Sequence, residues 1–111
     1  MLTTAIAIAA AQVAAPAPAD YRDTANWLCR PGREDSCTVN LDATVVAPDG
    51  SRTIEKFTPA ANPKFDCFYV YPTVSTDQTP NSDLSIDAPD RRVAINQAAR
   101  LSSARGVHAP L

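Results

Sequence analysis

The sequence has few of the residues on which many enzymes and nucleic-acid-binding proteins depend. Its 111 residues include one histidine, three glycines and three cysteines, and its formal net charge is −2. This mild acidity argues against a nucleic-acid partner, because such partners are normally bound by a basic patch. His108 is the only imidazole available as a general base or metal ligand. We therefore expect no cofactor, no metal site and no complete catalytic centre.

The length limits the chain to one domain with a thin core. Domains usually contain about 100–150 residues. A folded chain of this size buries roughly two thirds of the surface that its unfolded form exposes. Ten prolines against three glycines predict many turns.

The N-terminal segment, residues 1–19, carries no charge and is rich in alanine. The apolar run Leu2–Ala15 is shorter than the about 20 residues of a transmembrane helix, so we expect no stable membrane span. It is typical of the apolar region of a signal peptide, although no basic residue precedes it. Cleavage after Ala17-Pro18-Ala19, or alternatively after Val13-Ala14-Ala15, would export the chain; with the preferred site it would begin at Asp20. An alanine-rich tail is the other interpretation.

Cys29 and Cys37 lie eight positions apart in a segment rich in turn-forming residues. Their spacing is not C-x-x-C, and no second pair or histidine cluster completes a zinc site. In an oxidising compartment this pair favours a local disulfide, worth about 2 kcal/mol at best. Two reduced thiols are the alternative. Cys67 is then left unpaired.

Residues 43–57 predict a β-hairpin. Ala43–Val46 is short and β-branched, and Ser51–Phe57 alternates in side-chain character. Between them, Ala47-Pro48-Asp49-Gly50 has proline at the second and glycine at the fourth position of a turn.

Phe65–Val74 is the most apolar run after residue 20. Its continuous block Cys67–Tyr71 is typical of a strand with both faces covered, as in a parallel sheet. Pro72 ends this strand, and the polar loop Ser75–Asp87 follows.

A helix is predicted to begin after Asp87, with Pro89 and Asp90 in its first turn. It should end near Ser102 or Ser103, and Val107–Leu111 should form another strand. The expected buried face contains Ala94, Ile95, Ala98 and Leu101, and the expected exposed residues are Arg91, Arg92 and Gln97. The predicted fold class is α/β, with a hairpin followed by a βαβ unit whose strands are parallel.

Three strings carry a resemblance to a known family: Asn26–Pro31 (NWLCRP), Cys67–Asp77 (CFYVYPTVSTD) and Thr79–Asp83 (TPNSD). They resemble bacterial secreted α/β-hydrolase-fold proteins of unassigned function, sometimes described as lysophospholipase-like. The resemblance extends over residues 20–111, which correspond to the N-terminal part of a typical member.

The resemblance implies a role for the loop after Phe65–Tyr71, which would be the third strand of the hydrolase sheet, with residues 43–57 as the N-terminal hairpin. In this fold that loop supplies one backbone N–H of the oxyanion hole. Pro72 has no N–H, so Thr73 or Val74 is the candidate donor. The alternative is that this stretch only ends a strand.

The catalytic residues of the family are not found here. No glycine frames a serine as G-x-S-x-G, and His108 stands where the family usually has an aromatic residue. Members also tend to carry a cysteine near the position of Arg105 that could reach Cys67.

We therefore expect a truncated N-terminal fragment of a secreted serine hydrolase for esters or lipids, with an incomplete sheet and no activity alone. In the full-length protein, the partner would be a small-molecule ester. The alternative is a small exported disulfide-containing binding or interaction domain without catalysis.

Overall fold

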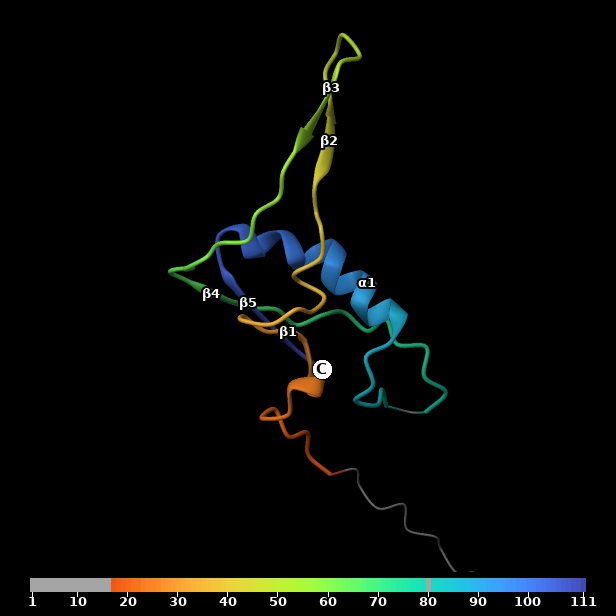
Figure 1. Cartoon of the computed structure of the whole chain (residues 1–111). Helices are drawn as coiled ribbons and strands as arrows, with labels where there is room; N and C mark the ends of the chain where they lie inside the picture. The colour runs from red at the N-terminus through yellow and green to blue at the C-terminus, as the bar shows by residue number, and fades with distance from the viewer. Residues whose placement is uncertain (1–16, 80) are drawn as a thin grey trace, which may run out of the picture.

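A computed structural model of the chain describes residues 17–79 and 81–111. Its main sheet has three strands in the order β1-β5-β4, and a separate two-stranded sheet joins β2 and β3. Figure 1 shows helix α1 and the 3₁₀ helix η2 beside the main sheet, with the hairpin β2–β3 projecting away. The elements are η1 (Thr24–Asn26), β1 (Trp27–Cys29), β2 (Ala43–Val46), β3 (Arg52–Glu55), β4 (Asp66–Phe68), α1 (Ala88–Gln97), η2 (Ala99–Ser103) and β5 (Gly106–Pro110).

Most of the predicted signal segment, residues 1–16, lies outside the described residues. Residues 17–20, which include the preferred cleavage site, have no regular secondary structure. Among the helices of the described ranges, none has the length and apolar character needed to cross a bilayer.

The predicted parallel strand pair is present. β4 and β5 run parallel, with Phe68 opposite His108, and α1 lies between them in the chain. β4 is shorter than predicted, and the expectation that both its faces are covered is wrong. The side chains of Phe65, Phe68 and Val70 are 68%, 66% and 75% exposed. Side chains alternate between the two faces of a strand, and Cys67, Tyr69 and Tyr71 are half-buried, whereas the opposite face with Phe68 and Val70 is exposed, so only one face is covered. β4 is also an edge strand: within residues 17–79 and 81–111, no strand pairs with its outer side.

The predicted hairpin is confirmed, but it does not join the main sheet. Ala43 lies opposite Glu55 and Val46 opposite Arg52. The turn between the strands needs glycine, because Gly50 has φ +82°, a left-handed conformation that side chains disfavour. β1, which the sequence patterns did not predict, pairs antiparallel with β5.

Helix α1 begins as predicted. Asp87 and Asp90 form a capping box, in which the Asp87 N–H donates to Asp90 Oδ2 over 3.0 Å. The predicted exposure of the two arginines and Gln97 is also confirmed, as is the burial of Ala94 and Ala98.

The prediction for the end of this helix is wrong in one respect. Leu101 is 38% exposed, while Ala99 is fully buried. The chain continues after Gln97 as the 3₁₀ helix η2, which has about three residues per turn. This tighter winding rotates Leu101 away from the face on which an α-helix would place it.

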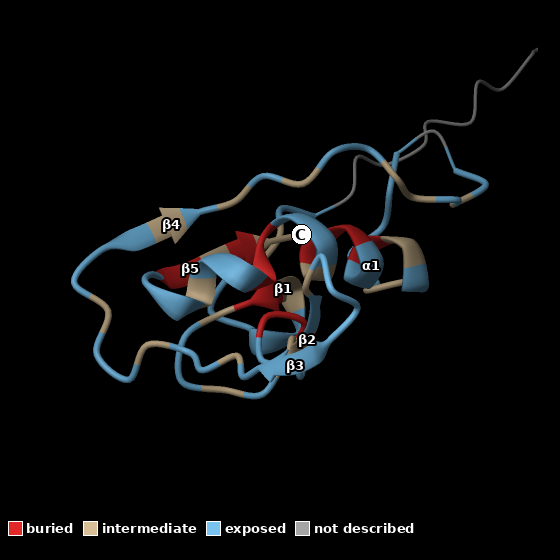
Figure 2. Cartoon of the chain, turned by 90° about the horizontal axis from the view of Figure 1, so that it is seen from above, coloured by how far each residue is buried: buried red, intermediate tan, exposed pale blue. Residues whose placement is uncertain are grey.

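The core lies between the helices and the inner strands. Figure 2 shows that buried residues are concentrated in β1, β5 and part of α1, whereas β4 and the hairpin are largely exposed. Alanines of α1 and η2 allow the helices to approach the strands closely. The core cluster consists of Leu28, Cys29, Cys37, Ala94, Ala98, Ala99, Val107 and Ala109.

Candidate functional site

The loop after β4 borders a pocket. Thr73 and Val74, the two predicted oxyanion-hole donors, line this pocket of about 190 Å³ together with Tyr71, Ser75 and Ser82. Because β4 runs into this loop, the pocket lies beyond the carboxyl end of a parallel strand. This is where open α/β sheets commonly bind their ligands.

The backbone of this loop leaves hydrogen-bond donors available. Thr73 is exposed and Val74 is half-buried. Neither residue's N–H donates a hydrogen bond to any described residue. Pro72 contributes no donor, since its nitrogen carries no hydrogen. The two N–H groups are therefore not used in hydrogen bonds among the described residues.

Acidic side chains organise the loop around the pocket. Asp77 Oδ2 accepts hydrogen bonds from the Asp83 N–H at 3.0 Å and from Ser82 Oγ at 3.1 Å. The bond from the Asp83 backbone is the main cause that holds the pKa of Asp77 below its usual value. Burial, followed by the nearby carboxyl group of Asp90, raises the pKa of Tyr71. The pocket thus has a neutral phenol on its wall and the ionised carboxylate of Asp77 beside it.

Asp90 is the most buried carboxylate near this loop, with 2% of the residue exposed. Its Oδ2 accepts the Asp87 N–H, whereas Oδ1 has no hydrogen-bond partner among the described residues. An unpaired buried carboxylate oxygen is costly. Its place in the first turn of α1 offsets part of this cost through the helix dipole.

His108 lies in β5, as a strand residue rather than as part of a recognisable triad. Its Nε2 is 3.2 Å from Asp66 Oδ1, and its ring meets Trp27 edge-on at 6.3 Å. Sequence reasoning missed the carboxylate of Asp66. The parallel register explains the pair, because Phe68 opposes His108 and Asp66 lies two positions earlier on the same face. None of the hydroxyl groups described is hydrogen-bonded to this histidine.

The disulfide between Cys29 and Cys37 is present, which confirms the predicted pairing. Both cysteines are buried in the core, and Ser102 Oγ donates to the Cys37 carbonyl at 3.4 Å. This short covalent loop therefore joins the end of β1 to η2. Cys67 is unpaired, as predicted, and it is half-buried.

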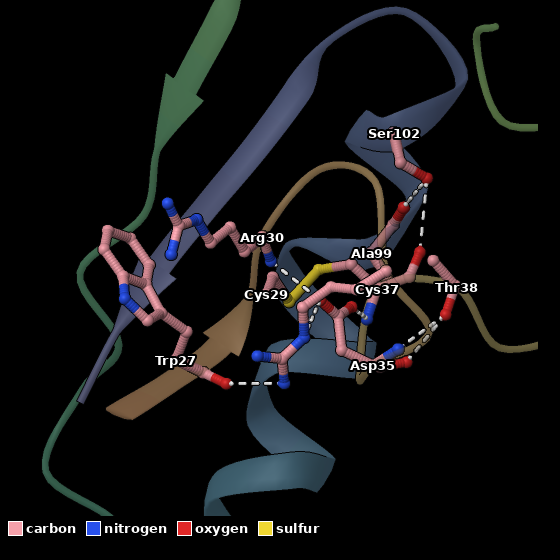
Figure 3. Close-up of a disulfide and its surroundings, with 9 residues drawn as sticks. Trp27, Cys29, Arg30, Asp35, Cys37, Thr38, Ala99 and Ser102 are labelled. Carbon is pink, nitrogen blue, oxygen red and sulfur yellow. Dashed lines mark hydrogen bonds and ion pairs between the residues drawn. A yellow bond between two sulfur atoms is a disulfide. The ribbon is translucent and has the colours of Figure 1, made fainter. Parts of the chain in front are cut away.

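Asp35 organises this loop, and sequence reasoning missed it. Its carboxylate accepts the Arg30 N–H at 2.7 Å and the Cys37 N–H at 2.8 Å, as Figure 3 shows. Arg33 Nε lies 3.5 Å from Oδ2, and the Asp35 side chain is only 3% exposed. An aspartate two residues before a cysteine in a short turn-rich loop is a signal that could have indicated such a network.

Comparison with known proteins identifies no relative. No protein-family model, no curated protein and no solved structure matches this chain.

Proposed function

We propose that these residues form the leading part of an exported α/β-hydrolase that cleaves carboxylic esters, with lipid esters included in that class. The observation that carries the proposal is the pocket beyond β4: Thr73 and Val74 are among its lining residues, and neither backbone N–H donates a hydrogen bond to a described residue. The resemblance of Cys67–Asp77 to a secreted hydrolase family points to the same loop.

The open edge of β4 supports this interpretation. β4 pairs with β5 on one side only, and the apolar side chains of Phe65, Phe68 and Val70 remain exposed. Such an edge is a template for a further strand. In a hydrolase sheet, a following strand would carry the nucleophilic serine on its elbow close to the oxyanion loop.

In this proposal, the chain contributes part of the oxyanion hole. In the full enzyme, serine would attack the ester carbonyl, and histidine would transfer the proton to the leaving alcohol. The N–H of Thr73 or Val74 would bind the oxyanion of the tetrahedral intermediate. Such a donor contributes about 3 kcal/mol of transition-state stabilisation, which corresponds to a factor of roughly 10²–10³ in kcat.

Ester hydrolysis tests the proposal in two steps. The purified chain alone should give no turnover above a buffer blank, because it has no assigned nucleophile; measurable turnover would contradict this part. In the longer polypeptide containing the serine, Val74→Pro and Thr73→Pro are compared, since each removes one N–H. One of the two should lower kcat by roughly 10²–10³ with little change in KM. Unchanged kcat in both variants would overturn the assigned loop.

The second candidate is a small exported binding domain without catalysis. The Cys29–Cys37 disulfide within the core favours this candidate, because such cross-links stabilise small secreted domains. Tyr69, Tyr71 and the polar loop from Ser75 would then form its recognition surface. A cooperative thermal transition of residues 20–111 would favour this candidate, whereas a gradual transition would favour the hydrolase fragment.

A further inference from the structure

The disulfide loop contains a set of atoms with the chemistry of a metal site. One ligand atom each from Cys29, Asp35 and Cys37 can be chosen so that all lie within 4.8 Å of one another. Two sulfurs and one carboxylate oxygen are ligands that zinc accepts. In the oxidised chain the sulfurs are bonded to each other, so they are free to bind an ion only after reduction.

We propose that, once the Cys29–Cys37 disulfide is reduced, this loop binds one divalent cation of the zinc class through both sulfurs and Asp35. The two ends of the loop are then linked either by the disulfide or by the metal ion. This site is independent of the proposed hydrolase function, because none of its three residues lies near Thr73 or Val74 in the sequence or lines the same pocket.

The geometry of the loop suits this exchange. The Cα atoms of Cys29 and Cys37 are 5.4 Å apart. Two sulfurs bound tetrahedrally to zinc through bonds of about 2.3 Å would lie about 3.8 Å apart. Cleavage of the S–S bond and small side-chain rotations provide this separation without a large movement of the backbone.

Asp35 keeps acceptor capacity for an ion. Its Oδ1 accepts one hydrogen bond, from the Cys37 N–H, and a carboxylate oxygen can accept a second interaction. The bonds from the backbone of Arg30 and Cys37 fix the orientation of the carboxylate. Supporting hydrogen bonds of this kind are what orients carboxylate ligands in metal sites.

The charges around the loop also match a divalent ion. Two thiolates and one carboxylate carry three negative charges, which the ion and Arg33 together neutralise. This balance is needed because both cysteines and the Asp35 side chain are almost fully buried. A charged cluster in such a place is stable only when it is paired.

A pocket gives the ion a path to this loop. It has a volume of about 170 Å³, and Asp35 and Cys37 are among its lining residues. The pocket can also hold the water molecule that completes a four-coordinate site with three protein ligands.

The chemical balance requires a two-electron reductant, such as a dithiol. The dithiol transfers two electrons and two protons to the disulfide, which becomes two thiols while the reductant becomes a disulfide. The ion then replaces the two thiol protons, which are released to solvent as two metal–sulfur bonds form.

Cobalt titration of the full chain tests the proposal. The Cys67→Ser variant, which leaves only the two loop cysteines, is reduced with a phosphine, freed of it without oxygen and titrated with Co²⁺. We expect thiolate-to-cobalt charge-transfer absorption that saturates at one equivalent and disappears when Zn²⁺ is added. The oxidised chain should show none.

Two comparisons make the test specific. Asp35→Asn should weaken Co²⁺ binding by about tenfold or more, since even altered supporting residues cost that much in metal sites. Asp42→Asn, which changes a carboxylate in the hairpin, should leave the affinity unchanged. The proposal is overturned by absence of the band in the reduced chain, by unchanged affinity in Asp35→Asn, or by equal affinity in urea, which would indicate a flexible dithiol only.

Discussion

The two sides of the main sheet differ in how far their apolar side chains are buried. On the side of β1, β5 and the helices, Leu28 and Val107 are almost completely buried, at 1% and 4% exposure. On the side of β4, Phe68 is 66% exposed, and in the hairpin Val46 and Ile54 are 61% and 58% exposed. The side chains are equally apolar, so hydrophobicity alone does not explain the difference.

The difference follows from what each strand contacts. β5 has a neighbour on both sides and η2 against it, and the backbone of Leu111 is hydrogen-bonded to Asn26. β4 has one neighbour, and β2 and β3 pair only with each other. A strand buries its apolar residues only when elements distant in the sequence cover it. The following predictions test this contrast between a covered and an uncovered region.

The largest effect is expected for a core truncation. Leu28→Ala should lower the free energy of unfolding by about 3 kcal/mol, because it removes a fully buried side chain and leaves a cavity. The matched change Ile54→Ala in the exposed hairpin should cost less than about 0.5 kcal/mol. Urea denaturation of both variants measures the contrast. Equal losses would show that the two regions are covered alike.

The second effect concerns the covalent loop. Replacing Cys29 and Cys37 together by serine should lower the free energy of unfolding by about 2 kcal/mol, from the loop-closure entropy of so short a loop. Cys67→Ser, which removes a free thiol, should cost about 1 kcal/mol or less. Denaturation under non-reducing conditions provides the measurement. A double variant as stable as the parent chain would rule out a stabilising role for the bridge.

A smaller effect is expected where β5 meets the exposed strand. A Cβ added at Gly106 would come within 2.5 Å of Asp66 Oδ1. Because the Asp66 side chain is 76% exposed, it can rotate away, and the loss of its contact with His108 costs about 1 kcal/mol or less. Gly106→Ala should therefore fold with a slightly lowered Tm. Failure to fold would mean that Asp66, or Pro31 with its Cγ 3.3 Å from the added Cβ, does not move aside.

The smallest effect concerns the base of the hairpin. The Lys56 ammonium group, and then the Phe57 N–H, hold the pKa of Asp42 below its ordinary value. This stabilisation is present above the unfolded-state pKa of about 3.9 and is lost as pH falls through the lower folded-state value. NMR shifts of the hairpin amides should follow this titration. Asp42→Asn should abolish it, whereas Asp23→Asn should preserve it; persistence of the titration in Asp42→Asn would assign it to another group.

Local patterns predicted the elements that depend on neighbouring residues. The turn at Pro48 and Gly50 and the cap at Asp87 are both present because the chemistry that forms them lies within a few residues. The pairing of Cys29 with Cys37 is equally local.

Pairings between distant segments could not be predicted in the same way. β1 is only three residues long, and its strand conformation depends on pairing with β5, near the other end of the sequence. The His108–Asp66 contact depends on the register of β4 against β5, which neither segment encodes alone. The sequence indicated Thr73 and Val74 as residues of the proposed site. It did not indicate their pocket, because the pocket also needs Ser82, which lies beside them only in the folded chain.

The reading frame that follows the codon for Leu111 tests most directly whether the open edge of β4 belongs to a hydrolase sheet. If it does, the downstream DNA encodes a Gly-x-Ser-x-Gly elbow followed by an acidic residue and a histidine, when it is translated past any stop codon or frameshift. A downstream sequence with no such elbow in any frame would contradict the proposed function.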